Sequence, residues 1–402
     1  MAEDYNRFFE ESAAQRGARV QTMQLPGTDA RYRLLLIGAG KIGREHIQVA
    51  QLLGRATVQG IFDTDRGSIE AALALFQEIG AEAPQVHSSL EAALADTSYD
   101  AILVCTPNYT HYDILQQAFK TGKPLFVEKP IATSLVDAAR IVEQARDYAG
   151  FIQIGMQYRY KSQYTEAFRE TKQRNALGAV KTISMSEYRP PFLDKVKQWN
   201  KFNEYSGGTL VEKCCHYFDL INLMAETRPR RVYASGGQAV NFLDFEYEGQ
   251  ASDIHDHAFV VVDYDNGIRG SFTLNMFCEE LYEELIVAGE KGRLIAMEAS
   301  SFKRDTASVG RIKVEVEGHA DYEFRDVTYP GIVERSGHHG ATFFEHEALV
   351  AQLEGRGVNS ATPMQGLWAM IVASAAQHSI EEQSVVEIDD YLRQCELSWL
   401  TD

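Results

Sequence analysis

Short apolar runs alternate with longer amphipathic segments in the first part of the chain. Residues 34–37, 56–62 and 100–104 are apolar runs of strand length, and a helical stretch follows each of them. Strands are also predicted at 85–87, 124–127 and 151–155, and helices at 68–79, 90–95, 112–121 and 134–148. Strands that alternate with helices of about 10–15 residues predict a parallel, doubly wound sheet, in which ligands bind at the carboxyl ends of the strands.

The pattern changes near residue 150. An alternating strand is predicted at 181–188, and a loop rich in aromatic residues and lysine at 189–206. Further strands are expected at 231–239, 258–264, 269–277, 283–288 and 293–298, and helices at 156–173, 207–224, 342–353 and 367–380. Consecutive strands with hairpin turns indicate a mostly antiparallel sheet. We therefore expect an α/β protein with an N-terminal extension (1–30), a doubly wound domain (31–150) and a second domain (151–402).

The first strand runs directly into a glycine-rich turn. Gly38, Gly40 and Gly43 have the spacing G-x-G-x-x-G, with Lys41 and Ile42 between the last two glycines. The first glycine permits a tight turn, the second lets a pyrophosphate approach the backbone, and the third lets helix and strand pack closely. The free N–H groups and positive dipole end of the following helix favour phosphate.

An acidic residue at the end of the second strand supports dinucleotide binding. Asp63 lies about 20 residues past the glycines, where a carboxylate accepts hydrogen bonds from both hydroxyls of an adenosine ribose. The alternative is that Asp63 merely ends a strand in a turn. The order of strand, glycines, helix, strand and acid favours a bound dinucleotide. Because a carboxylate repels a 2′-phosphate, NAD is favoured over NADP.

Composition and charge restrict the partners. The net charge of −18 disfavours nucleic acid and anionic membranes, and a neutral small-molecule substrate suits this surface better than a polyanion. The five cysteines are odd in number and form no C-x-x-C, which is typical of reduced thiols in a cytoplasmic protein. No apolar run reaches transmembrane length, and the N-terminus lacks the features of a secretory signal.

Lys129 is a candidate acid/base. It lies between Glu128 and Pro130, just past a predicted parallel strand, where ligands bind. A lysine beside a cationic nicotinamide ring should have its charged form disfavoured, which suits a general base for a hydroxyl proton. The alternative is a surface lysine that opens a helix, with Pro130 early in that helix.

Glu212 and His216 form a second candidate pair. On the predicted helix 207–224 they are four residues apart, on one stripe with Asp219 and Leu223, while Val211, Cys214, Phe218 and Ile221 form another. An imidazole with an acid one turn away can pass protons or hold a substrate hydroxyl. The alternative is a core histidine neutralised by its neighbour.

No metal site is expected. Cys214 and Cys215 are adjacent, and neighbouring residues on a helix point about 100° apart, so both cannot easily reach one metal ion. In the sequence DIHDH at 253–257, alternation along a strand lets only three side chains converge, and a structural role is favoured. His338, in a glycine-flanked loop, is a possible substrate contact, as are Trp199 and Asn200 in the loop 189–206.

These motifs together resemble the Gfo/Idh/MocA oxidoreductases. The resemblance rests on GAGKIGREH, the acid of FDTD, CTPNYTH, EKP and GG-x-L-x-E-x-x-x-H-x-x-D, and it extends from about residue 32 to 395. It implies a Rossmann domain, an α/β domain with a large open sheet, NAD(P), and usually sugar or polyol substrates. Members often associate through the open sheet as dimers or tetramers.

The resemblance also implies roles for matching residues. Lys129 matches the acid/base lysine, His216 the histidine of the catalytic helix, and Glu212 a position usually filled by aspartate. Cys214 stands where glycine is common. The segment lining the nicotinamide half is matched by Thr106, Pro107, Asn108 and His111, with Glu128 as its neighbour. Tyr158 and Arg159 match the stretch beside the substrate.

The expected activity is reversible oxidation of a secondary hydroxyl of a cyclic polyol, sugar or glycoside, with NAD as oxidant. Two alternatives share the same residues. One is an NAD-dependent glycoside hydrolase that oxidises the sugar transiently and eliminates the aglycone. The other is a non-catalytic, NAD-responsive regulator. A homodimer or homotetramer is expected.

Overall fold

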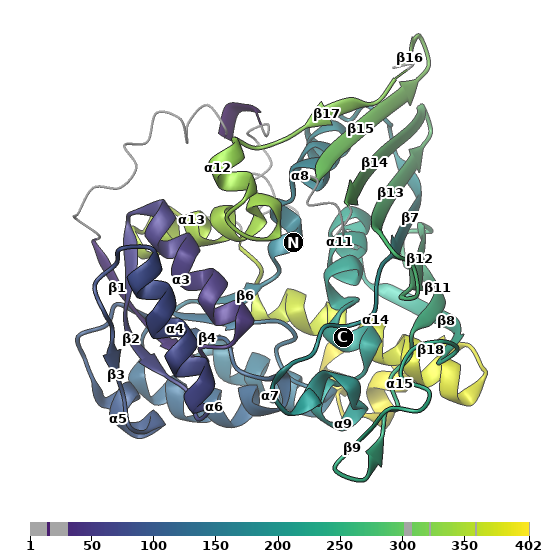
Figure 1. Cartoon of the computed structure of the whole chain (residues 1–402). Helices are drawn as coiled ribbons and strands as arrows, with labels where there is room; N and C mark the ends of the chain where they lie inside the picture. The colour runs from purple at the N-terminus through teal and green to yellow at the C-terminus, as the bar shows by residue number, and fades with distance from the viewer. Residues whose placement is uncertain (1–13, 17–30, 301–307, 321–322, 358–359, 402) are drawn as a thin grey trace.

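The computed structural model describes residues 14–16, 31–300, 308–320, 323–357 and 360–401 of the 402-residue chain. The predicted N-terminal extension therefore lies outside the described residues, apart from three helical residues at 14–16. Figure 1 shows the first domain beside a large, strongly twisted sheet, with helix α11 (Cys215–Ala225) between them.

The first domain is the predicted doubly wound sheet. Its six strands are all parallel, in the order β3-β2-β1-β4-β5-β6. The strands are β1 (Tyr32–Ile37), β2 (Ala56–Phe62), β3 (Gln85–Val86), β4 (Ala101–Val104), β5 (Leu125–Glu128) and β6 (Ile152–Gly155). The helices between them are α3 (Lys41–Leu53), α4 (Arg66–Glu78), α5 (Leu90–Ala95), α6 (His111–Ala118) and α7 (Leu135–Arg146). The central strands β1, β4 and β5 are apolar because helices cover both faces of such a sheet.

The sixth strand lies past the predicted boundary at residue 150. β6 pairs in parallel with β5, from Leu125 opposite Ile152 to Glu128 opposite Gly155. The first sheet is therefore complete only at Gly155. The polypeptide returns to it near the C-terminus, because the Ile154 amide donates to the Ala361 carbonyl at 2.9 Å.

The second domain contains a large mixed sheet that is mostly antiparallel, as expected. The strand order is β16-β15-β14-β13-β7-β12-β11-β8-β18, β17 pairs with β15, and only β7 and β12 run parallel. Its strands are β7 (Val180–Tyr188), β8 (Pro229–Gly237), β11 (His257–Tyr264), β12 (Arg269–Asn275), β13 (Leu281–Gly289), β14 (Gly292–Ser300), β15 (Val309–Val316), β16 (His319–Ala320), β17 (Arg325–Val327) and β18 (Val386–Glu387). A separate hairpin joins β9 (Glu246–Tyr247) to β10 (Gln250–Ala251).

Two predicted helices are interrupted. The stretch 156–173 divides into η3 (Gln157–Tyr160), α8 (Ser162–Phe168) and η4 (Arg169–Gln173), because Lys161 is extended and its ammonium donates to Glu283 and Glu298. The stretch 207–224 divides into α10 (Thr209–Glu212) and α11. The predicted loop 189–206 contains η5 (Val196–Lys201) and α9 (Asn203–Ser206).

The last helices join the two domains. α13 (Ala341–Leu353) packs on α3, and α14 (Pro363–Glu382) packs on α7 as well as on α11 and β8. The remaining elements are η1 (Asn108–Thr110), η2 (Phe119–Thr121), α12 (Gly331–Glu334), η6 (His338–Gly340), α15 (Ile388–Gln394) and η7 (Ser398–Leu400). None of the helices in the described segments is both long and apolar enough to span a membrane.

Candidate active site

The glycine-rich turn has the geometry that a dinucleotide requires. Gly38 has φ +96°, and a Cβ there would lie 2.6 Å from the Cys105 carbonyl. A Cβ on Gly43 would lie 2.1 Å from the Gly38 oxygen, so helix and turn touch at this point. A Cβ on Gly40, in contrast, would meet no atom within 4 Å. The first and third glycines serve the fold, and the second faces open space where phosphate can approach.

The start of α3 differs from those of α4, α5 and α7. Asp65, Ser89 and Ser134 each accept a backbone N–H at the start of α4, α5 and α7. α3 begins at Gly40 without a side-chain cap. Its first N–H groups are therefore available for an anion, as phosphate binding requires.

Asp63 is bound to the same turn. One carboxylate oxygen accepts the Ala39 amide at 2.7 Å, and the other accepts the Asp65 amide at 2.8 Å. These contacts orient the carboxylate at the end of β2, and each oxygen keeps a lone pair for a ribose hydroxyl. The residues present fit NAD.

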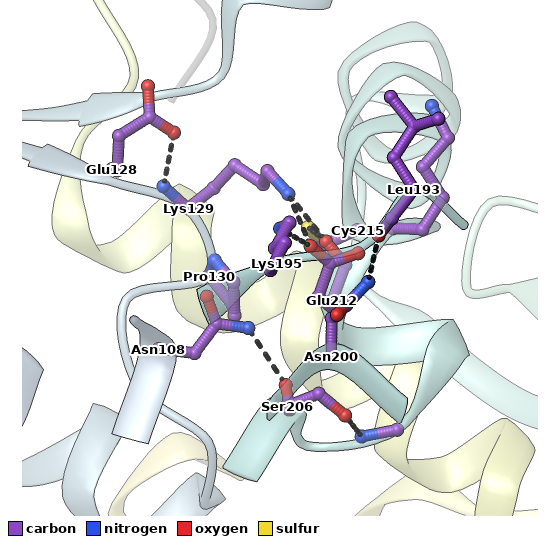
Figure 2. A network of polar contacts seen from close by, with 12 residues as sticks. Asn108, Glu128, Lys129, Pro130, Leu193, Lys195, Asn200, Ser206, Glu212 and Cys215 are labelled. Atoms are coloured by element: carbon purple, nitrogen blue, oxygen red, sulfur yellow. Dashed lines mark hydrogen bonds and ion pairs between the residues drawn. The ribbon is translucent and has the colours of Figure 1, made fainter. Parts of the chain in front are cut away.

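A hydrogen bond and an ion pair between Lys129 and Glu212 connect the two domains. The Lys129 ammonium donates to the Glu212 carbonyl at 2.7 Å and lies 3.7 Å from its Oε1 (Figure 2). This contact depends on the interruption between α10 and α11. In a continuous helix the Glu212 carbonyl would accept the amide of His216. Here it lies at the end of α10 and accepts from a lysine of the other domain.

The pKa of Lys129 shifts in the direction opposite to the one expected from the sequence. Burial alone would lower the pKa of Lys129, but the Glu212 carboxylate raises it above its ordinary value. Burial likewise acts to raise the pKa of Glu212, and Lys129 and Lys195 lower it well below its usual range. The expected lowering at Lys129 considered only the positive nicotinamide ring and not this carboxylate.

His216 lies on the first turn of α11, stacked on Tyr158. The ring centroids are 4.2 Å apart and the planes differ by 5°. Burial and the charge of Lys129 hold the pKa of His216 well below its ordinary value, so the ring is neutral. Its buried Nδ1 has no hydrogen-bond partner among the described residues. A neutral imidazole with an unpaired nitrogen can bind or relay a hydroxyl proton.

The loop 189–206 brings further polar groups to Glu212. The Lys195 ammonium donates to Glu212 Oε1 at 3.0 Å and lies 4.2 Å from the centroid of the Trp199 ring. Asn200 is buried, and its amide nitrogen donates to the Leu193 carbonyl, as Figure 2 shows. Its Oδ1 has no partner within the described part of the chain. The predicted residues Trp199 and Asn200 therefore lie near the contact between Lys129 and Glu212.

Side chains of the segment 105–111 bind backbone carbonyls around the site. Asn108 donates to the Ser206 carbonyl at 3.0 Å, which connects this segment to the second domain. The buried His111 ring lies between the carbonyls of Pro130 and Thr106, at 2.9 and 3.0 Å. The Thr106 hydroxyl is hydrogen-bonded to Thr110, and Pro107 precedes η1. His111 thus positions the backbone around Lys129, and direct cofactor contact by its ring stays a prediction.

Glu128 is oriented by a buried histidine pair. One carboxylate oxygen contacts His46 Nε2 at 2.9 Å, and His46 Nδ1 contacts His346 Nε2 at 2.7 Å. The other oxygen accepts the Lys129 amide at 3.1 Å. This chain of hydrogen bonds connects α13, α3 and the backbone amide of Lys129. It therefore helps to position Lys129.

Two residues that were predicted to contact substrate, Arg159 and His338, are bonded to carboxylates of the protein. Arg159 forms a buried, bidentate ion pair with Asp219, at 2.6 and 2.5 Å. Its guanidinium therefore orients η3 against α11. His338 Nδ1 lies 2.7 Å from Glu45 on α3, and its ring is 6.4 Å from that of Tyr158. The Tyr158 hydroxyl accepts a hydrogen bond from Lys213, and its ring lies against His216.

The DIHDH sequence has a structural role at Asp256. Its carboxylate accepts the amides of residues 239, 240 and 241 and contacts His257 at 2.8 Å. Cys214 and Cys215 are free, buried thiols. Across the described segments, no group of three or more His, Cys, Asp or Glu side chains could hold a metal ion.

Sequence reasoning missed Lys195, Lys213 and the His46–His346 pair. Lys195 had one weak signal, which was the abundance of lysine in the loop 189–206. His46 is visible in the sequence three residues past Gly43, but its partner His346 is 300 residues away. No local pattern predicts that contact.

Two family profiles match most of the chain. Residues 32–156 match an oxidoreductase family described as an NAD-binding Rossmann fold. Residues 172–388 match the C-terminal alpha/beta domain of the same oxidoreductase family.

Individual relatives share at most 26% sequence identity with this chain in the three comparisons that follow. A myo-inositol 2-dehydrogenase of Thermotoga maritima is 26% identical over 267 residues, which is 66% of this chain and 75% of the relative. An inositol 2-dehydrogenase of Rhizobium meliloti is 23% identical, over 89% of this chain and 99% of the relative. The crystal structure of a scyllo-inositol dehydrogenase from Lactobacillus casei, with NAD(H) and scyllo-inositol, superposes with a TM-score of 0.69 at 18% identity, covering 89% and 99% of the two chains. With both domains matched in order, the chain belongs to the Gfo/Idh/MocA family and is an NAD-dependent oxidoreductase.

Proposed function

We propose that this oxidoreductase reversibly oxidises a secondary hydroxyl of a cyclic polyol, sugar or glycoside, with Lys129 as acid/base and Glu212 and His216 as its partners. The observation that carries the proposal is the contact between Lys129, at the end of β5, and Glu212, at the end of α10. It brings an amine and a carboxylate from the two domains together, and the neutral imidazole of His216 follows at the start of α11.

Different residues of the first domain would bind different parts of NAD. A bound NAD would supply the acceptor for a hydride from the carbinol carbon. The start of α3 and Gly40 would hold the pyrophosphate, and Asp63 would hold the adenosine ribose. The Asp63 carboxylate disfavours a 2′-phosphate. Lys129 takes the hydroxyl proton in the oxidising direction and returns it in the reducing direction.

The substrate half offers hydrogen bonds suited to neutral hydroxyl groups. Asn200 Oδ1 and His216 Nδ1 are buried and unpaired among the described residues, and Trp199 adds an aromatic face. Tyr158 and His338 complete the set of proposed contacts. A wrong epimer would leave one of these groups unpaired, which is a strong basis for discrimination. The inositol dehydrogenases among the relatives support this substrate class.

A substrate panel tests the proposal. Inositols, aldoses and aryl glycosides are incubated with the enzyme and NAD, and NADH absorbance and aglycone release are recorded together. NADH formation in proportion to a ketone product supports the dehydrogenase. Repeated aglycone release without added NAD would instead support the hydrolase. Tight NAD binding with no turnover of any substrate would support the regulator.

We further propose a homo-oligomer that associates through the open face of the large sheet. Tyr233, Phe259 and Val261 are 47%, 60% and 46% exposed on adjacent strands, and Tyr233 lies directly opposite Val261. Such an apolar patch is typical of an interface. The double variant Phe259→Glu with Val261→Glu should shift the mass measured by light scattering to that of the monomer. An unchanged mass would exclude this face. Five free thiols agree with a reducing compartment such as the cytoplasm.

A further inference from the structure

Oxidation of an alcohol by NAD releases one proton for each molecule of NADH. Lys129 can take that proton, but its side chain is only 13% exposed, so the proton needs a path outward. The Glu212 side chain beside it is 6% exposed. Lys195, which contacts the same carboxylate, is 36% exposed. Of these three groups, Lys195 has the most contact with solvent.

Both amines contact the Glu212 carboxylate, as Figure 2 shows. Lys129 Nζ lies 3.7 Å from Glu212 Oε1, and Lys195 Nζ donates to that same oxygen at 3.0 Å. One carboxylate oxygen thus contacts two amines, one from the first domain and one from the loop 189–206. We propose that Lys195 is a second proton-handling residue, and that Lys129, Glu212 and Lys195 carry the alcohol proton to solvent. The inference rests on the dehydrogenase function proposed above.

The loop that supplies Lys195 is held on both sides of it. The Asp194 carbonyl accepts from Lys41 Nζ at 3.1 Å, so the loop is bound to the glycine-rich turn of the first domain. The Leu193 carbonyl accepts from Asn200 at 3.1 Å, and the Asp194 carboxylate pairs with Lys201 at 2.6 Å. Lys195 therefore has a defined position where the cofactor and substrate domains meet.

The surroundings of Lys195, above all its burial, lower its pKa. It faces the Glu212 carboxylate from α10, Lys129 and Glu128 from the end of β5, and the Trp199 ring from its own loop. Burial is the largest influence and lowers the pKa of Lys195, and the charge of Lys129 lowers it further, against the opposing effect of Glu212. The pKa of Lys129 is raised instead. The outer amine thus gives up a proton more readily than the inner one.

The transfers conserve atoms and charge. Before turnover, Lys129 and Lys195 are ammonium groups that donate to Glu212. The Lys195 ammonium first releases a proton to water, and Glu212 Oε1 then carries a proton from Lys129 to the freed amine of Lys195. As the alcohol is oxidised and the dinucleotide is reduced, the hydroxyl O–H bond breaks and its proton joins the free amine of Lys129. Glu212 is again a carboxylate, both lysines are again ammonium groups, and one proton has passed to water.

The first experiment follows protons and NADH together in the complete enzyme. Stopped-flow mixing with NAD and the best panel substrate, in weak buffer with a pH indicator, compares wild type with Lys195→Met, Lys195→Arg and Lys197→Met. Lys197 is an exposed lysine of the same loop and is the matched control. In Lys195→Met we expect proton release and NADH formation to slow together, with kcat lower by about tenfold or more and partly recovered on adding methylamine. The Lys197 variant should match wild type.

The arginine variant separates a proton carrier from a fixed charge. A guanidinium keeps the positive charge beside Glu212 but does not release its proton at ordinary pH. We therefore expect Lys195→Arg to be as slow as Lys195→Met and to show an altered pH profile of kcat. Wild-type kcat and pH profile in Lys195→Arg would overturn the proposal.

A second experiment does not depend on turnover. Trace acetylation at a series of pH values, read by mass spectrometry against an added lysine amide standard, measures where Lys195 becomes reactive. We expect reactivity at lower pH than the standard. A midpoint at or above that of the standard would overturn the proposal, whatever the activity. If the wild type oxidises nothing in the panel, the proposed function fails, and the labelling still decides whether Lys195 gives up its proton readily.

Discussion

The cofactor half and the substrate half of this protein are built by different means. Around the glycine-rich turn, the important groups are backbone atoms and one acid within 26 residues, from Gly38 to Asp63. Around Glu212, the important groups are side chains from β5, η3, the loop 189–206 and α10–α11. The first half depends on local spacing, whereas the second depends on contacts between distant segments.

This difference separates rigid backbone geometry from adjustable side-chain chemistry. Gly38 and Gly43 touch backbone atoms that cannot move, so their replacement would affect the fold. Lys195, Asn200 and His338 lie in irregular segments, where the backbone has positive φ at Lys197, Gln198 and His338. Loops of this kind can change substrate specificity without altering the cofactor site.

Replacing Lys129 should have the largest effect. Lys129→Met removes the acid/base and the contact with Glu212, so kcat should fall by about 10²–10⁴. NAD affinity, measured by calorimetry, should stay within about twofold, because the phosphate and ribose contacts lie elsewhere. Lys120→Met, on the surface of the same domain, provides the control. Retained turnover in Lys129→Met would remove the proposed base.

The second-largest effect is expected from breaking the Arg159–Asp219 ion pair, which should lower the stability of the protein. Asp219→Asn leaves the buried guanidinium without its counter-charge and should cost about 3–5 kcal/mol of unfolding free energy in urea. The double variant Arg159→Met with Asp219→Leu should recover much of that loss. A strongly raised KM together with normal stability in Arg159→Met would support the sequence prediction that Arg159 binds substrate.

Two glycine variants should separate folding from cofactor binding. Gly43→Ala places a methyl group against the Gly38 carbonyl and should cost about 1–3 kcal/mol. Gly40→Ala meets no protein atom, so its Tm without NAD should match wild type, but the rise in Tm on adding NAD should largely disappear. Equal loss of NAD stabilisation with no change in folding for both variants would contradict the assignment.

The smallest expected effect is a pH-dependent one at the junction of the two halves. The pairing of Glu45 with His338 and Thr342 outweighs burial and lowers the pKa of Glu45 to about 2. Its stabilisation is present above the unfolded value of 4.5 and is lost as pH falls toward 2. Glu45→Gln should therefore lose at most about 3 kcal/mol near pH 6. Its Tm difference from wild type should shrink below pH 4.5, and a constant difference would contradict this.

Much of the fold was predictable because its signals are local. The apolar runs that become β1, β4 and β5 need burial on both faces, and alternation predicts strands such as β11 and β12. β18 is only two residues long and exists because Val386 pairs with Val232. The break after α10 was not predicted either, because the residues GGTLVEKCCHYF are compatible with an unbroken helix. Only tertiary contacts determine where that helix stops.

The amino-acid sequence by itself determined the class of fold and the glycine-rich turn that binds a dinucleotide. It also indicated, through Asp63, that NAD is favoured over NADP, and it identified Lys129 and His216 as candidate proton-handling residues. Those features depend on spacing along a few tens of residues. Tertiary structure alone decided that Arg159 pairs with Asp219, that Glu128 is oriented by His46 and His346, and that Lys195 shares a carboxylate with Lys129. The physical reason is that ion pairs and hydrogen bonds act over a few ångströms in space, and the groups that make them are 60–300 residues apart in several of these cases.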